Sequence, residues 1–370
     1  MISRRSCLAA VAGVLAPACG RKNAPTAASK PKKHPSAGIP LPTKDPAAAR
    51  TRPDQLAAFS SALGGNGVVL RHGAIIHQWG KPNAPLDVAS ASKPVLAHLV
   101  LLAVHSGRIP SLDDPVLRWL PALGSLNPSL NHKDAAITWR HLITQTSCYG
   151  VSETPGTAFD YCDFQMSLLW KLLFEKLYAV SPEDADSKVL RPLLFDRLDA
   201  TDSPFIRIRN APQPSGRLAI SARDMARFGL LYLNGGSWNG QQLLPQSIVH
   251  AALNSPLPPS LHRSKGTDAD MLPDIRSYGG GKNQEDHLGC YSFLWWLNRP
   301  DPSGKLLWPS LPPDAFAAIG NGGVRTMIAF PSLGVVASWN KSNLQHLPVS
   351  AGGREQMDAA LTPLIAAIDP

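Results

Sequence analysis

The sequence predicts an α+β fold, in which one antiparallel β-sheet is built from both ends of the folded body and is flanked by helices. Two β-rich stretches, at residues 67–80 and 324–340, each have the pattern of two strands joined by a tight turn. A long apolar helix follows the first stretch. Between about 107 and 284 the patterns are helical or loop-like, which predicts a mostly helical inserted subdomain. The sheet should therefore come from residues 54–90 and 285–370.

Each expected element has a local signal in the sequence. His72-Gly73 supplies turn residues for the first hairpin, and Pro331-Ser332 joins the strands of the last one. Gly107 ends the apolar helix. The expected helices cover residues 95–104, 167–178, 221–236, 243–253 and 355–368, and the last two strands cover 324–330 and 333–340.

Composition limits the class of function. The chain has 370 residues, of which 44% are hydrophobic and 17% are charged, so it holds enough apolar material for a sizeable core. The formal net charge of +9 comes from residues 1–53, which contain ten basic residues and one acidic residue. Residues 54–370 contain 26 of each and are balanced. A nucleic-acid-binding domain needs a basic face of its own, so we expect no nucleic-acid partner.

The N-terminal segment predicts export. Residues 1–19 have a charged start, an apolar core and small residues at Ala16 and Ala18, which is typical of a signal peptide. The stretch "SRRSCL" is close to a twin-arginine signal; cleavage near Ala18 is one outcome, and lipidation of Cys19 is another. Residues 20–53 are rich in proline, alanine and lysine and should form a disordered linker. We therefore expect a periplasmic or cell-envelope protein, attached to a membrane only if Cys19 is lipidated.

Ser90 and Lys93 are a candidate catalytic pair. They are three residues apart, so on a helix they share a face. Pro94 fits the first turn of a helix, which places Ser90 at the helix start and at the positive end of its dipole. A lysine backed by apolar residues could have its pKa lowered and act as the base for the serine. The alternative is an N-capping serine beside a lysine whose ammonium reaches solvent.

The cysteines and histidines show no metal signature. Cys148, Cys162 and Cys290 lie in the body of the chain. A disulfide between Cys148 and Cys162 would close a short loop and, if unstrained, would stabilise the fold by about 3 kcal/mol. Because three cysteines cannot all pair with one another, the sequence does not decide whether this disulfide forms. Neither Cys-x-x-C nor His-Glu-x-x-His occurs. We expect no metal ion and no cofactor.

Longer segments resemble one protein family. The segment "DVASASKPVLAHLV" around Ser90 is similar to the active-site segment of the serine β-lactamase and penicillin-binding-protein superfamily. The pattern is closest to class C-type β-lactamases, D-alanyl-D-alanine peptidases and related esterases. Further segments agree in the same order, at residues 107–121, 137–150, 155–176, 220–249 and 318–340. The resemblance covers roughly residues 55–370 and implies a β-lactamase/transpeptidase-like fold for the domain 54–370.

The resemblance implies a serine mechanism. Ser90 would attack a carbonyl carbon and form an acyl-enzyme, and Lys93 would help to deprotonate it. Tyr161, in "FDYCDF", would be the second base and later the acid that protonates the leaving group. A nearby ammonium should lower the tyrosine pKa. The backbone N–H groups of Ser90 and Val324 would form the oxyanion hole.

One departure from the family pattern follows the tyrosine. Asp163 stands where the family usually has asparagine. An ionised carboxylate only accepts hydrogen bonds, and it would hold Lys93 protonated. Either Asp163 is itself protonated, or Lys93 acts mainly as a positive charge that activates Tyr161.

A second departure concerns substrate charge. Penicillin-recognising members generally have Lys-Thr-Gly in the strand motif, where the cation helps to hold the substrate carboxylate. Here the motif is Asn321-Gly322-Gly323, an uncharged variant like that of the esterase-like members. The two glycines would let a substrate lie against the backbone of the strand. Together with Asp163, these residues form the expected substrate-binding set.

The sequence therefore predicts an exported, monomeric serine hydrolase. It would act on a small-molecule ester or amide, or on a peptide, through a Ser90 acyl-enzyme. The first alternative is a β-lactamase or D-Ala-D-Ala carboxypeptidase, which Asn321 speaks against. The second is a catalytically silent homologue that binds peptidoglycan or peptides.

Overall fold

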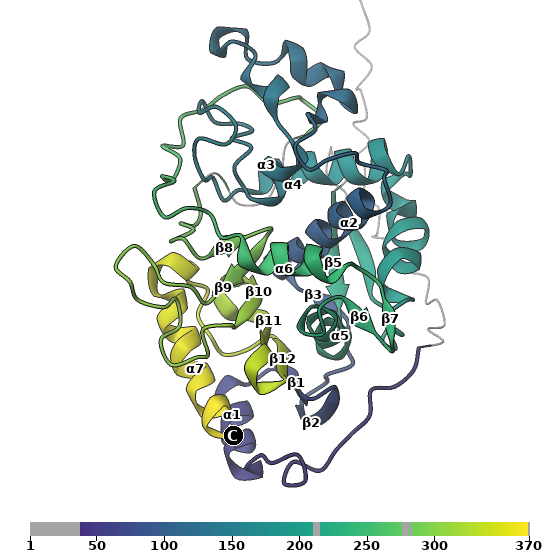
Figure 1. Cartoon of the computed structure of the whole chain (residues 1–370), viewed down its shortest axis with the longest axis vertical. Helices are drawn as coiled ribbons and strands as arrows, with labels where there is room; N and C mark the ends of the chain where they lie inside the picture. The colour runs from purple at the N-terminus through teal and green to yellow at the C-terminus, as the bar shows by residue number, and fades with distance from the viewer. Residues whose placement is uncertain (1–37, 210–214, 276–280, 282, 369–370) are drawn as a thin grey trace, which may run out of the picture. The chain divides into compact units, whose positions relative to one another are not determined.

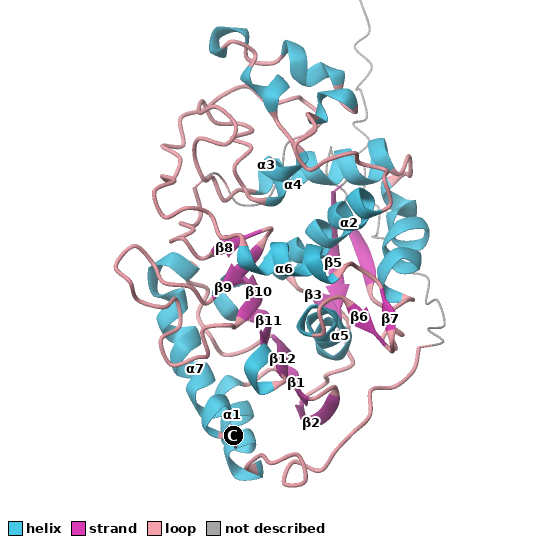
Figure 2. Cartoon of the chain, viewed as in Figure 1, coloured by secondary structure: helices cyan, strands magenta, loops and turns pink. Residues whose placement is uncertain are grey.

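A seven-stranded antiparallel sheet lies at the centre of the fold (Figure 2). The computed structural model describes residues 38–209, 215–275, 281 and 283–368. The strand order is β2-β1-β12-β11-β10-β9-β8. The strands are β1 (Asn66–Arg71), β2 (Ala74–Trp79), β8 (Tyr291–Ser292), β9 (Trp295–Leu297), β10 (Phe316–Gly320), β11 (Arg325–Phe330) and β12 (Val335–Asn340). β1 pairs with β12 along its whole length, from Asn66 opposite Asn340 to Arg71 opposite Val335. The predicted sheet from both ends of the body is confirmed.

Both predicted hairpins are present. β1 and β2 are joined by His72 and Gly73, which have φ angles of 49° and 81°. Two central residues at positive φ suit the right-handed twist of a hairpin. β11 and β12 are joined by the 3₁₀ turn Pro331–Leu333, followed by Gly334 at a φ of 61°.

Helices cover both faces of this sheet (Figure 1). Helices α1 (Pro53–Leu63) and α7 (Arg354–Ala366) pack together on one face, where Phe59 of α1 lies with its ring centroid 6.4 Å from that of Trp339. Helix α5 (Ala222–Leu233) packs on the other face, against β1, β11 and β12. Because both faces are covered, β12 is buried at every position instead of alternating between core and solvent.

The inserted subdomain is mostly helical, as expected. It follows helix α2 (Lys93–His105), which is the predicted apolar helix and carries Pro94 in its first turn. Its α-helices are α3 (Trp139–Ile143), α4 (Asp163–Trp170) and α6 (Gln246–Asn254). Two π-helical segments follow α4, at Lys171–Leu177 and Asp186–Phe195. Short 3₁₀ helices lie at Val116–Arg118, Pro121–Ser125, Pro128–Leu130, Lys133–Ala136 and Pro182–Asp184.

The sequence missed two smaller sheets. A three-stranded antiparallel sheet has the order β3-β5-β4, and a two-stranded one joins β6 and β7. The strands are β3 (Leu86–Asp87), β4 (Phe205–Arg209), β5 (Ser215–Ile220), β6 (Ser237–Trp238) and β7 (Gln241–Gln242). β3 precedes Ser90, and it meets β5 only because the chain returns from far away in sequence. A pairing between segments so far apart has no local pattern in the sequence that could predict it.

The expected linker ends before residue 53. Residues 1–37, with the predicted signal peptide and Cys19, lie outside the described residues. From residue 38 the chain runs along the domain. Lys44 N–H donates to the Ile75 carbonyl at 2.9 Å and Ile75 N–H to that of Pro42 at 2.8 Å, so this stretch covers the free edge of β2. Thr51 forms a β-bridge with Ile368. Proline does not prevent these contacts, because an extended segment can add to a sheet edge.

The described residues carry no disulfide. Cys148, Cys162 and Cys290 are buried free thiols, so the structure does not form the Cys148–Cys162 bridge. Within the same residues, no helix has the length and apolarity needed to cross a membrane. No group of histidine, cysteine, aspartate or glutamate side chains in these ranges is arranged to hold a metal ion.

The close packing of α5 on the sheet predicts a sensitive position. A Cβ at Gly229 would overlap Met327 and lie 2.9 Å from Val336. Gly229→Val should therefore lower the free energy of unfolding by about 1–3 kcal/mol through overpacking. Urea unfolding measures this, with Ala359→Val on the exposed side of α7 as the matched control. Equal midpoints for the two variants would show that α5 does not pack this closely.

Candidate active site

Ser90 lies in a strained turn at the entrance to helix α2. The 3₁₀ turn Ala89–Ser92 precedes the helix. Ala89 has a φ of 49°, a left-handed conformation that is unusual for any residue with a side chain. Its N–H donates to Oδ1 of Asp87 at 2.7 Å, and Arg217 pairs with Oδ2 of the same carboxylate at 3.1 Å. These two contacts hold the turn that presents the Ser90 hydroxyl.

Strand β10 ends directly against this turn. A Cβ at Gly320 would overlap the Val88 carbonyl oxygen and lie 3.1 Å from the Ala91 nitrogen. Only glycine allows the strand to approach so closely. The approach brings Asn321, the residue after β10, to the same cavity as Ser90.

Lys93 lies one helical turn after Ser90 and is buried, with 4% of its surface exposed. Its Nζ donates to Ser90 Oγ at 2.9 Å and to Asp163 Oδ1 at 3.2 Å. It also lies 4.5 Å from the centroid of the Tyr161 ring. Lys93 belongs to α2, Asp163 to the start of α4 and Tyr161 to the loop before α4. The lysine therefore links the inserted subdomain to helix α2.

The Lys93 ammonium keeps its proton. Burial lowers the Lys93 pKa, but interactions with the oxygens of Tyr161 and Asp163 favour the ammonium, outweigh burial and leave the pKa above its ordinary value. The expectation of a lowered Lys93 pKa is therefore wrong, whereas the alternative expectation, that Asp163 holds Lys93 protonated, agrees with the direction of the shift. Of the two roles considered for Lys93, the structure favours a positive charge.

Tyr161 rests as a neutral phenol. Burial is the largest influence on its pKa and raises it; Lys93 and Ser90 lower it, whereas Glu285 and Asp163 raise it. The net pKa is raised. The expected lowering by Lys93 exists, but desolvation exceeds it.

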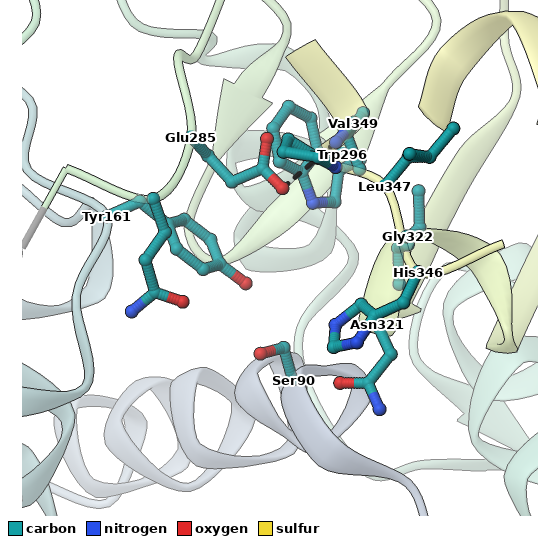
Figure 3. Close-up of a pocket in the computed structure, with 12 residues that line it drawn as sticks. Ser90, Tyr161, Glu285, Trp296, Asn321, Gly322, His346, Leu347 and Val349 are labelled. Carbon is teal, nitrogen blue, oxygen red and sulfur yellow. Dashed lines mark hydrogen bonds between the residues drawn. The ribbon is translucent and has the colours of Figure 1, made fainter. Parts of the chain in front are cut away.

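An aromatic cluster positions the tyrosine. Tyr161 is 5% exposed, and its ring centroid lies 6.3 Å from that of Phe159, 6.0 Å from that of Tyr291 and 6.4 Å from that of Trp296. Figure 3 shows its hydroxyl pointing to the side of the cavity where Ser90 lies. The phenol is thus fixed at the edge of the cavity with one polar atom available to it.

Ser90 opens into a cavity of about 160 Å³. Figure 3 shows Tyr161 and Glu285 toward one side of it and Asn321 toward the other. The lining residues are Ser90, Tyr161, Gln284, Glu285, Trp296, Ile319, Asn321, Gly322, His346, Leu347, Pro348 and Val349. Of the expected site residues, Ser90, Tyr161, Asn321 and Gly322 line the cavity. Lys93 and Asp163 lie behind Ser90 and contact each other instead.

Two expected contacts differ in the structure. Val324 does not line the cavity, and its N–H donates to the Asn321 carbonyl at 3.2 Å, so it is not available to an oxyanion. Gly323 lies behind the turn, where its carbonyl accepts from Trp339 Nε1 at 2.7 Å and a Cβ would overlap or crowd the core. The reason is that Asn321–Gly323 is a 3₁₀ turn, whereas the sequence predicted an extended strand. Asn321 reaches the cavity in place of Val324.

Several lining residues were not predicted. Glu285 and His346 come from two segments that carry no catalytic motif, 284–285 and 346–349. Glu285 is 9% exposed, and burial raises its pKa. No local pattern marks it, since an acid in a loop is normally a solvated residue. Gly320 was also missed, although a glycine at the end of a strand signals a close backbone approach.

Gly320→Ala should displace the nucleophile turn. A shift of about 1 Å at a reacting group lowers rates by about 100-fold, so labelling of Ser90 by a fluorophosphonate probe should slow by about that factor. Gly124→Ala is the control, because its Cβ meets only the end of the Leu117 side chain. Equal labelling rates for the two variants would contradict the role given to Gly320.

Comparisons with known proteins agree with this arrangement. The sequence model of the Beta-lactamase family matches residues 54–339. A putative 6-aminohexanoate-dimer hydrolase from Bacillus anthracis has a similar structure, with a TM-score of 0.60 and 16% identity, covering 91% of this chain and 89% of that one. A penicillin-binding protein homologue from Caulobacter crescentus gives a TM-score of 0.57 and 15% identity over 86% of this chain and 99% of that one.

A third solved structure is described as EstCE1, a hydrolase with promiscuous acyltransferase activity. It gives a TM-score of 0.51 and 12% identity, covering 84% of this chain and 98% of that one. At these identities the structures show a shared fold. The family match covers most of the sequence, from helix α1 to strand β12, and contains Ser90, Lys93 and Tyr161. The chain belongs to the Beta-lactamase family.

Proposed function

We propose that the protein is a serine hydrolase that cleaves an ester or amide through an acyl-enzyme on Ser90. One observation carries this proposal: the Lys93 ammonium lies 2.9 Å from Ser90 Oγ, in a site that opens into a cavity shared with the Tyr161 phenol. A nucleophile, a charge that stabilises its alkoxide and a phenol that can carry its proton are the parts that acyl transfer needs.

The proposed reaction steps follow from the charges of Lys93, which is protonated, and of Tyr161, which is a neutral phenol at rest. Ser90 Oγ attacks the carbonyl carbon, and its proton passes to Tyr161 when that residue is in its phenolate form, which the Lys93 ammonium stabilises. Tyr161 then protonates the leaving alcohol or amine, and Ser90 holds the acyl group as an ester. Water attacks this ester, and Tyr161 takes and returns the proton, releasing a carboxylic acid. The Ser90 N–H, in the turn before helix α2, is the expected donor to the developing oxyanion, and Asn321 lines the same cavity.

Charge and size support a small substrate without a carboxylate. No lysine or arginine is among the described residues that line the cavity, and Asn321 stands where penicillin-recognising relatives carry a cation. A volume of about 160 Å³ is below the range of about 300–1,000 Å³ that holds drug-sized ligands. Two neighbours are described as a putative 6-aminohexanoate-dimer hydrolase and as EstCE1, a hydrolase with promiscuous acyltransferase activity, and these descriptions agree with a hydrolase. We also propose that the protein is exported through residues 1–19 and acts as a monomer in the periplasm or cell envelope.

Paired variants test the proposal. The full chain is incubated with p-nitrophenyl acetate, a chromogenic cephalosporin and a fluorophosphonate probe. Ester turnover should fall by about 10⁴-fold or more in Ser90→Ala and by about 10²–10⁴-fold in Tyr161→Phe, with probe labelling lost only in Ser90→Ala.

Other outcomes decide between the alternatives. Faster turnover of the cephalosporin than of the ester would favour a β-lactamase. Failure of the wild-type chain to react with all three reagents would favour a silent binding protein. Tyr291→Phe is the matched control for Tyr161→Phe, since Tyr291 lies in the same aromatic cluster but does not line the cavity.

Asp163 predicts a shift in the pH profile. Its charge raises the pKa values of both Tyr161 and Lys93. Asp163→Asn should lower both, so the phenolate forms at a lower pH and the acid limb of kcat/KM moves to lower pH. A kcat/KM profile between pH 5 and pH 10 measures this, with Glu183→Gln on the surface as the control. An acid limb that stays in place or moves to higher pH would exclude Tyr161 and Lys93 as the groups that limit the rate.

A further inference from the structure

The cavity beside Ser90 carries a negative charge on its wall. Glu285 is the one aspartate, glutamate, lysine or arginine among the described residues that line it. Figure 3 shows its carboxylate on the side of the cavity where the Tyr161 ring lies. A largely buried carboxylate attracts cations and repels anions more strongly than a carboxylate in bulk water does. Its position therefore bears on which substrates can enter.

The Glu285 carboxylate is held in place by backbone donors. Oε1 accepts from Val349 N–H at 2.9 Å, and Oε2 accepts from Ser350 N–H at 3.1 Å and from Ser350 Oγ at 3.0 Å. The two oxygens of a carboxylate offer about four acceptor positions, so about one remains. Because the carboxylate is already oriented, a ligand that binds there does not have to order it.

The loop that carries Glu285 is fixed from the opposite side as well. Gln284 N–H donates to the Tyr161 carbonyl at 3.1 Å, and Asn283 N–H donates to Asp160 Oδ1 at 2.8 Å. Glu285 is thus attached to the segment that carries Tyr161. Its distance from the reacting groups is set by the backbone and not by a mobile side chain.

Neighbouring cations are already engaged elsewhere. Lys93 donates to Ser90 and to Asp163 and does not line the cavity. Burial raises the Glu285 pKa and Arg263 lowers it by a smaller amount. Arg263 is exposed and donates to Asn283 Oδ1 at 2.7 Å. Neither side chain places a positive charge on the cavity wall beside Glu285.

We propose that Glu285 selects substrates whose leaving group carries an ammonium. We place the ammonium on the leaving group, and not on the acyl group, because Glu285 lies on the same side of the cavity as Tyr161. In the proposed mechanism Tyr161 protonates the leaving group. This inference rests on the proposed function. It reverses the charge preference of relatives that hold a substrate carboxylate with a lysine, the residue that Asn321 replaces here.

The same contact should affect the chemical step. Glu285 is one of the charges that raise the Tyr161 pKa. A substrate ammonium beside Glu285 offsets that charge and makes the phenolate easier to form. A cationic leaving group should therefore raise kcat as well as lower KM.

Three acetate esters of similar shape test the proposal. They are 2-(dimethylamino)ethyl acetate, which is cationic near neutral pH, its neutral isostere 3-methylbutyl acetate, and the anionic acetate ester of 3-hydroxypropanoate. In the wild-type chain, kcat/KM for the cation should exceed that for the neutral ester by about tenfold or more, as expected for a charged hydrogen bond. The anion should react most slowly, and added salt should reduce the differences.

Two variants separate charge from loop structure. In Glu285→Gln the ratio of cation to neutral should fall to about one, and the neutral ester should react faster because the charge opposing the phenolate is gone. Ser350→Ala removes one hydrogen bond to Glu285 but keeps its charge, so the preference for the cation should persist.

The outcomes distinguish the two proposals. Equal kcat/KM for cation and neutral ester in the wild-type chain, or an unchanged ratio in Glu285→Gln, would overturn the selection by Glu285 while leaving the hydrolase intact. If the wild-type chain hydrolyses none of the three esters faster than Ser90→Ala does, both proposals fail. The wild-type series decides the matter even where a variant does not fold.

Discussion

The arrangement of the site depends on a buried ammonium that must be compensated. Lys93 has 4% of its surface exposed, and an uncompensated charge there would destabilise the fold by several kcal/mol. Its partners come from separate places in the chain. Ser90 precedes it by one turn, whereas Asp163 and Tyr161 belong to the inserted subdomain, about 70 residues later. The subdomain therefore has to lie on helix α2 for the lysine to be buried at all, and this contact also assembles the groups proposed to react.

A second constraint comes from the backbone. β10 can end against the turn of Ser90 only because Gly320 lacks a side chain. The sheet that carries β10 is in turn closed by the pairing of β1 with β12. The cavity thus receives Asn321 from the end of β10 and Ser90 from the turn before helix α2, which are far apart in the sequence.

Charge separates this site from those of relatives that bind carboxylates. The lysine of the family strand motif is absent, and the one formally charged side chain on the described cavity wall is an acid. Glu285 is buried, accepts three hydrogen bonds and is tied to the Tyr161 segment. A buried acid in such an environment also opposes the phenolate that the mechanism needs. In the proposed selection of cationic leaving groups, a substrate ammonium beside Glu285 would offset that charge, and this links substrate charge to proton transfer.

The sequence by itself determined the α+β class, the two hairpins, the apolar nucleophile helix and the Ser90–Lys93 spacing. These depend on local patterns: period-2 and period-3.6 hydrophobicity, turn residues, and a fixed three-residue step along a helix. Tertiary structure decided the rest. The directions of the Lys93 and Tyr161 pKa shifts, the replacement of Val324 by Asn321 at the cavity, and the presence of Glu285 on its wall all arise from residues far apart in the chain. Electrostatic energies depend on distance and burial in space, and neither can be obtained from spacing along the sequence.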